Sequence, residues 1–469
     1  MKKFGLKDKI GYMFGDLGND FFFTFVSAYL MLFYTDVMGI GGTLVGMIFL
    51  VARIWDAFMD VAWGRFIDSR PVGKNGKFKP WMMRMAFPLV VIGVLMFTKF
   101  PGMSNNFQLV YAFSTYLIWG SLYSTVNIPY GSMASVITRD ATERGSLSTF
   151  RTIGSSLAGI VISIVVPTFV FINNKADSGR FSIIAIGFAI LAMCCYSGCY
   201  FLTTERIKSE GEEKKIYWKV TLAGMKRNKP LITFVITALI VLISGSFSGS
   251  MNAYLFKDYF HNAKALAFAG IILKTCPIAL APFIAPMIRR FGKKEAVCVS
   301  MLIATIANLF LFLLPIRNVE IYLAIYTISS LGMGVFGITI WAFVTDVIDY
   351  QEYLTDTREE GTTYAIYSFA RKIGQALAGG ISGIALGFIG YIGGAASQTP
   401  QVEIGIKNFT TLVPTIANLI VFLILAFLYP LSKDKLTQVT RELEERRLTK
   451  AKNAEIIKNR GVFETDLTK

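Results

Sequence analysis

The chain has 469 residues, of which 54% are hydrophobic and only 17% are charged, and its formal net charge is +16. A soluble domain carries about 25% charged residues, so this composition excludes an ordinary soluble protein. The basic residues lie in short segments between apolar blocks, which argues against nucleic-acid binding. With one histidine, His261, and no cofactor motif, a catalytic triad or a histidine-based metal site is not expected. The sequence indicates a membrane protein and not an enzyme.

Apolar blocks of about 20 residues or more are long enough to cross a bilayer as helices. We expect an all-α membrane protein with spanning helices at residues 10–38, 42–67, 81–100, 107–135, 147–173, 181–203, 231–256, 265–288, 296–316, 320–345, 363–393 and 408–431. The first block runs past the length of a signal-peptide core, so it is expected to remain in the protein.

The loops between these segments differ in charge. Lys and Arg accumulate on the cytoplasmic side of a membrane. Clusters of cations precede the first segment, follow the second, fourth, sixth and eighth, and fill the tail, whereas the other loops hold scattered cations such as Lys99, Lys175, Lys257 and Arg317. Both termini are therefore predicted to be cytoplasmic, in a bacterial inner membrane.

The longest polar interruption divides the segments six and six. We predict an N-terminal six-helix bundle at 1–203, a central cytoplasmic loop at 204–230, a C-terminal six-helix bundle at 231–432 and a charged, solvated cytoplasmic tail at 433–469. Short motifs recur at equivalent loops of the two halves, as expected of related bundles that move about a central site. A monomer suffices for this arrangement of two bundles. The expected partners are the lipid bilayer and a small-molecule sugar or glycoside.

Three ionisable residues share one face of the second segment. Arg53, Asp56 and Asp60 are three and four residues apart, so they point the same way on a helix. A charge at the centre of a spanning helix costs about 2.5 to 3.5 kcal/mol, so each needs a partner or a water-filled cavity. We favour a cation-coupling site over an ion-pair network that only locks helices. Asp20 adds a carboxylate from the first segment.

The fourth segment carries a polar and aromatic face. Tyr116, Tyr123 and Asn127 follow at spacings of seven and four residues. Such a face can stack on a sugar ring and bond its hydroxyl groups. Simple packing of the tyrosines is an equal alternative.

Cations also lie inside apolar sequence in both halves. Arg151 is in the fifth segment, and Lys372, with Gln375 beside it, is in the eleventh. They can neutralise the aspartates across a central cavity or bind an anionic substrate such as a uronide. The alternative is that these side chains reach out to the cytoplasmic surface, and it applies to Arg371 more than to Lys372.

Further charges follow the tenth segment at its cytoplasmic end. Asp346, Asp349 and Arg358 are expected to form gating ion pairs and not to contact substrate.

At several of these residues the sequence resembles the glycoside-pentoside-hexuronide:cation symporter family, a branch of the major facilitator superfamily that includes the melibiose carrier. The motifs that carry the resemblance are Tyr34-Thr35-Asp36-Val37, Arg53-Ile54-Trp55-Asp56 followed by Asp60, and Gly76-Lys77-Phe78-Lys79-Pro80-Trp81. Within the family, the glucuronide carriers look similar at Val126-Asn127-Ile128-Pro129 and at Arg371-Lys372-Ile373-Gly374-Gln375.

The resemblance implies roles for several residues. Asp56 and Asp60 match the cation site of the melibiose carrier, which has a third aspartate at the position of Asn127. Residues that match Asp20, Tyr123, Arg151 and Lys372 are implied for sugar recognition or its charge network. Because Asn127 removes one negative charge, we favour H⁺ over Na⁺ as the coupling ion. Gly131 stands where the melibiose carrier has a tryptophan, so melibiose itself is not expected as the substrate.

We therefore expect a symporter of a β-glucuronide, or of a related glycoside or pentoside, that works by alternating access. Apart from Na⁺ at Asp56 and Asp60, no metal site is predicted. The alternative is a facilitator or an efflux carrier for another small or amphipathic solute in the same fold.

Overall fold

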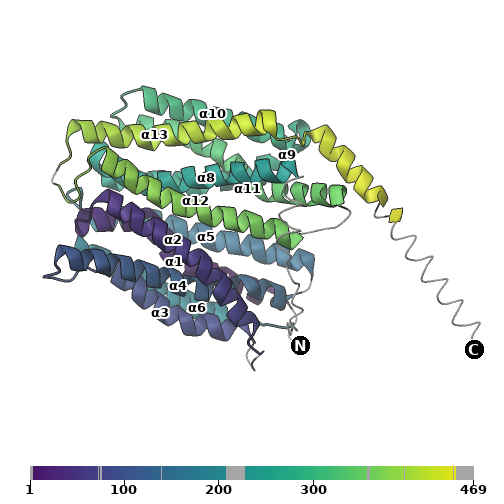
Figure 1. Cartoon of the computed structure of the whole chain (residues 1–469), viewed down its shortest axis with the longest axis horizontal. Coiled ribbons are helices and arrows are strands. Elements are labelled where there is room, and N and C mark those ends of the chain that lie inside the picture. Colours follow the sequence, from purple (N-terminus) through teal and green to yellow (C-terminus); the bar gives the residue numbers. More distant parts are fainter. Residues whose placement is uncertain are drawn as a thin grey trace, which may run out of the picture.

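The computed structural model describes residues 4–71, 73, 76–138, 140–207, 228–355, 360–395, 397–446 and 448–449. The long helices run roughly side by side, and the start of the first and the end of the last lie at the same end of the molecule (Figure 1). We call this the terminal end and the opposite one the far end.

Among the described residues, six long helices precede position 208 and six follow position 227. The first six are α1 (Leu6–Leu32), α2 (Gly42–Asp68), α3 (Phe78–Met96), α4 (Asn105–Ile137), α5 (Ala141–Val170) and α6 (Ser178–Leu202). The second six are α8 (Lys229–Tyr254), α9 (Leu266–Phe291), α10 (Lys293–Leu313), α11 (Val319–Thr355), α12 (Glu360–Phe388) and α13 (Pro400–Leu423). Each predicted segment overlaps one of them.

Short elements join or extend these helices. They are the π-helical turns η1 (Phe33–Val37), η2 (Leu255–Tyr259) and η4 (Ile424–Leu428), the 3-10 turn η3 (Ala263–Ala265), and the paired strands β1 (Phe171–Ile172) and β2 (Lys175–Ala176).

Within the described residues, 9 helices are long and apolar enough to cross a membrane. The long helices outside this group are α2, α4 and α12, whose sequences contain more polar residues. The number of crossings, the side of the termini and the exact domain boundaries stay predictions.

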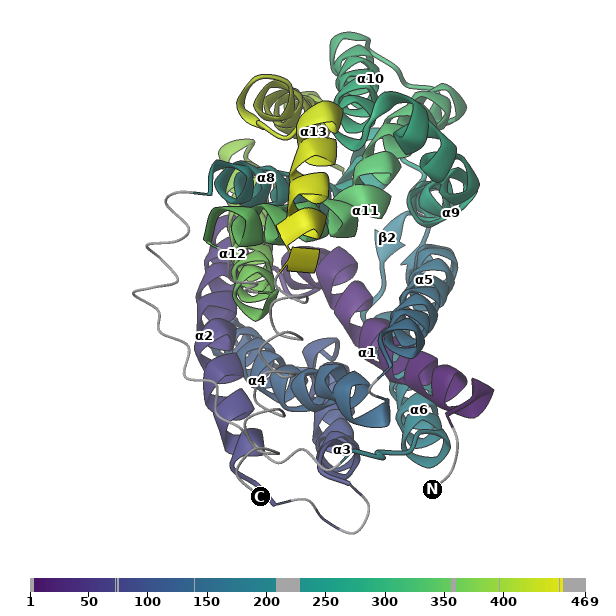
Figure 2. The same cartoon turned by 90° about the vertical axis from the view of Figure 1, so that its right-hand side faces the viewer.

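The two sets of helices pack mainly within themselves. In the first half α1 packs on α5 and α6, and α4 packs on α2 and α3; in the second, α8 packs on α12 and α13, and α11 packs on α9 and α10. The halves meet where α2 contacts α12, α5 contacts α9 and α1 contacts α8. Figure 2 shows this arrangement from the terminal end, with α2 beside α12 and α5 beside α9.

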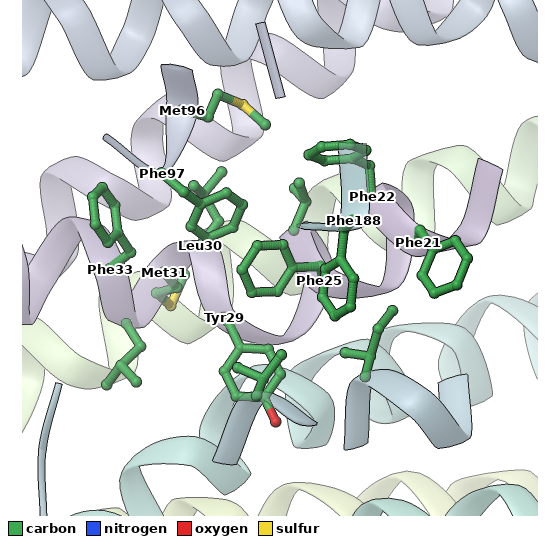
Figure 3. Close-up of a cluster of buried hydrophobic side chains, with 14 of the residues drawn as sticks. Phe21, Phe22, Phe25, Tyr29, Leu30, Met31, Phe33, Met96, Phe97 and Phe188 are labelled. Atoms are coloured by element: carbon green, nitrogen blue, oxygen red, sulfur yellow. The ribbon is translucent and has the colours of Figure 1, made fainter. Parts of the chain in front are cut away.

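Aromatic side chains fill the core of the first half. Phe25 of α1 stacks on Phe97 with 4.0 Å between ring centroids, and its edge meets Phe188 of α6 (Figure 3). Packing of this kind holds helices together in a membrane, where lipid is as apolar as the side chains.

Glycines allow α2 and α12 to approach each other closely. A Cβ atom on Gly383 would lie 2.4 Å from both the Gly42 carbonyl oxygen and the Gly46 Cα atom. A Cβ atom on Gly46 would lie 2.9 Å from the Gly380 carbonyl oxygen. These obstacles are backbone atoms that cannot rotate away, so the interface between the halves requires small residues here.

Helical structure also occurs outside the apolar sequence in two places. α11 continues to Thr355, ten residues past the predicted segment, because the polar sequence that follows the apolar block is helical as well. Residues 433–446 are helical as predicted, but not fully solvated: Val439 and Leu443 are buried, and Arg446 donates a hydrogen bond of 3.0 Å to the Tyr353 carbonyl. The tail therefore docks on the end of α11.

Gly383→Val should weaken the contact between α2 and α12. Overpacking against the backbone of Gly42 and Gly46 is expected to destabilise the protein by about 1–3 kcal/mol. Thermal unfolding in detergent measures this loss. Gly337→Val is the matched control, because a Cβ atom there meets nothing within 4 Å. Equal unfolding temperatures for the two variants would contradict the assigned packing.

Candidate functional site

A polar cavity of about 290 Å³ lies between the two halves. Side chains from α1, α2, α4, α5, α9 and α12 line it. Among them are all the residues predicted for cation coupling or substrate binding except Tyr116: Asp20, Asp56, Asp60, Tyr123, Asn127, Arg151, Lys372 and Gln375. Arg53 also lines it. Residues that are far apart in the sequence thus meet at one place.

A second cavity of about 290 Å³ adjoins the first and is more apolar. Tyr116 is buried at its wall, together with Tyr29 and Phe49, and the half-buried Tyr326 also lines it. The two cavities share five lining residues: Phe23, Thr24, Arg53, Lys274 and Gln375. The two spaces therefore form one chamber with a charged part and an aromatic part.

Ion pairs hold most of the charges in this chamber. Arg53 lies 3.6 Å from Asp56 on α2, which confirms that they share a helical face. Lys372 of α12 pairs with Asp60 of α2 and so joins the two halves. Because this pair is compatible with a cation site and with a lock between helices, both interpretations of Asp60 remain open.

Asp56 has one oxygen atom without a partner. Its Oδ1 atom is buried and makes no hydrogen bond within the described structure. Gly120 on α4 provides the space, because a Cβ atom there would lie 2.2 Å from that oxygen. A buried carboxylate oxygen without a donor is costly, so this atom is suited to bind a proton or a metal cation.

Asp16 is a site residue that sequence reasoning did not select. Arg151 donates a hydrogen bond of 2.9 Å to Asp16, and both line the polar cavity. The signal was its position four residues before Asp20, which puts both on one face of α1. Arg371 also lines the cavity, beside Lys372. Lys274 was not considered at all.

The predicted gating charges behave differently. Asp346 accepts a hydrogen bond of 2.5 Å from Lys293, so this pair joins α10 and α11 within one half. Asp349 lies one turn further along α11 and Arg358 lies outside the described residues. A gating role for these residues stays a prediction.

A buried polar cluster joins the two halves at the far end. Lys257 of η2 forms ion pairs with Asp36 of η1 and Asp258, and the Tyr391 hydroxyl donates a hydrogen bond of 2.8 Å to Asp36. The side chains of Asp36, Lys257 and Asp258 are only 4%, 7% and 7% exposed. We infer that these charge pairs close the far end of the chamber.

The same cluster reveals the internal repeat. The first helix of each half ends in a π-helical turn of five residues, and the fourth residue of each turn is an aspartate, Asp36 in η1 and Asp258 in η2. Lys257 bridges these two equivalent carboxylates. Its loop position suggested only a scattered surface cation, since hydropathy does not reveal a pairing across 221 residues.

Lys257→Gln should open the far end. The change leaves two buried carboxylates without their cation, and breaking such a pair costs about 3–5 kcal/mol. In a background without the five native cysteines, we expect labelling of Tyr29→Cys by an impermeant maleimide from the far side to accelerate at least ~10-fold. Lys264→Gln, an exposed lysine at the same end, serves as control. Unchanged labelling would refute the closure.

Comparison with known proteins supports this architecture. The family model described as "MFS/sugar transport protein" matches residues 11–433. The uncharacterized symporter YjmB of Bacillus subtilis (strain 168) is 35% identical over 448 residues, which cover 95% of this chain and 96% of that protein. The glucuronide carrier protein homolog of Escherichia coli (strain K12) is 34% identical over 443 residues, covering 93% and 95%.

Solved structures show the same fold. A crystal structure of a D-xylose-proton symporter matches with a TM-score of 0.64 at 12% identity, covering 91% of this chain and 98% of that one. This likeness concerns the fold alone. Together with the family model and the relatives, it establishes a multi-pass transporter of the bacterial inner membrane with the major facilitator fold. The chain belongs to the MFS/sugar transport protein family.

Proposed function

We propose that this transporter is a symporter that couples the entry of a β-glucuronide, or of a related glycoside or pentoside, to a cation, H⁺ in preference to Na⁺. The observation that carries the proposal is the charged cavity between the two halves. Both halves line it, as alternating access about a central site requires. A single chain contributes the whole cavity, so we infer that a monomer suffices.

The charges of the cavity favour an anionic solute. Five cationic side chains and four carboxylates line it: Arg53, Arg151, Lys274, Arg371 and Lys372 against Asp16, Asp20, Asp56 and Asp60. With all of them ionised, the balance is one positive charge. Binding of H⁺ or Na⁺ would add another, and a uronide carboxylate would offset it. The glucuronide carrier homolog of Escherichia coli supports this choice of substrate.

The pair between Asp60 and Lys372 offers a coupling device. A proton on Asp60 would remove the charge that holds Lys372, which would then be able to donate to the oxygens of a sugar. Bound sugar would hold Lys372 away from Asp60 and so favour the proton. Each ligand thereby raises the affinity for the other, which is what symport requires.

Two observations support H⁺. Asn127 lines the cavity near the aspartates but offers only a neutral carbonyl oxygen. The unpartnered Oδ1 atom of Asp56 can take up a proton alone, whereas hard metal cations prefer several oxygen ligands.

Uptake into proteoliposomes tests the proposal. We expect a pH gradient, inside alkaline, to drive accumulation of an aryl β-glucuronide at least ~10-fold over the level without a gradient, because one pH unit is worth about 1.4 kcal/mol. Asp60→Asn should abolish accumulation, since one carboxylate of the proposed cation site and the partner of Lys372 are lost together. Asp434→Asn, an exposed carboxylate, is the control. Accumulation driven only by a Na⁺ gradient would identify Na⁺, and not H⁺, as the coupling ion. Equilibration or export under either gradient would favour the facilitator or efflux alternative.

A further inference from the structure

One cation of the chamber lacks a carboxylate partner and faces both of its parts. Of the five cationic side chains, Arg53, Arg151 and Lys372 pair with Asp56, Asp16 and Asp60. Within the described residues, neither Lys274 nor Arg371 has a carboxylate oxygen within the 4.0 Å of a salt bridge. Only Lys274 of these two also lines the aromatic cavity.

The packing of α9 on α5 places Lys274 at the junction. A Cβ atom on Gly159 of α5 would lie 2.4 Å from the Lys274 Cε atom and 3.0 Å from its Nζ atom. The lysine therefore passes over α5 where that helix has no side chain. One turn away on α9, Gly270 accommodates Ser163 in the same manner. A charge of the second half is thus brought to the wall of a chamber that Arg53 of the first half also lines.

Asp20 is the carboxylate that attracts Lys274 from a longer distance, together with Arg151 and Arg371. Because no carboxylate oxygen among the described residues lies within 4.0 Å of it, the ammonium group of Lys274 keeps its hydrogen-bond donors available for a ligand.

The other cation at the junction is already engaged. Arg53 lies against Asp56 and over the rings of Phe23 and Tyr116, 5.5 Å and 5.9 Å from their centroids. Those rings form the wall beside the junction, so a flat or aromatic part of a solute can pack there while its charged part reaches Lys274.

We propose that Lys274 determines the specificity for an anionic substrate by binding the carboxylate of a hexuronide where the two parts of the chamber meet. This inference rests on the proposed glycoside transport and names the residue that would select charged glycosides over neutral ones. A charge-assisted hydrogen bond from an ammonium group to a carboxylate provides the discrimination.

Binding to purified protein tests it with two solutes that differ only in the group concerned, 4-nitrophenyl β-D-glucuronide and 4-nitrophenyl β-D-glucoside. Lys274→Gln should raise the Kd of the glucuronide at least ~10-fold and leave that of the glucoside within about twofold. Lys274→Arg keeps the positive charge and should therefore retain most of the glucuronide affinity. Lys264→Gln should change neither value.

Three results would overturn the inference. If Lys274→Gln weakens the binding of both solutes equally, the residue supports the structure of the chamber and does not bind the carboxylate. If it leaves glucuronide binding unchanged, the carboxylate lies elsewhere, and glycoside transport can still stand. If the wild-type protein binds neither solute, the proposed function fails and this inference with it.

Discussion

Ionised side chains within the bilayer must find partners inside the protein, and the rest of this structure depends on that constraint. Lipid offers neither hydrogen bonds nor counter-charges, so an unpaired charge at depth costs several kcal/mol. Three ion pairs of the chamber meet this need, whereas Asp56 Oδ1 and the ammonium group of Lys274 are among the described groups that lack such a partner. We assign ligands to these two groups, because a binding site must offer a ligand groups that the protein leaves unpaired.

The same constraint connects the two ends of the molecule. At the far end, Lys257 holds a carboxylate from each half, while in the middle Lys372 of one half holds Asp60 of the other. Separating the halves at either level breaks a pair between them. A transporter that alternates between two states must replace such pairs with water or ligand in turn, so binding of a cation or a sugar in the chamber can shift the balance at the far end.

Sequence reasoning found much of this arrangement because its signals are local. Spacing on one helix placed Arg53 beside Asp56, and the cost of burial selected Arg151 and Lys372 as central. It did not find Lys257 or Lys274, since each acquires its role only from the contact of helices that are remote in the chain. Asp36 was recognised as part of a family motif, but its partners on η2 were not. Pairing across halves depends on packing, which periodicity and hydropathy do not encode.

The central claim is that solute and cation move together through one chamber. Its most direct test is to add an aryl β-glucuronide outside proteoliposomes that have no ion gradient, and to record the internal pH while labelled solute enters. The account predicts internal acidification that begins with solute entry and stops when entry stops. Entry of the glucuronide with no change in internal pH, in the presence and in the absence of Na⁺, would contradict proton symport.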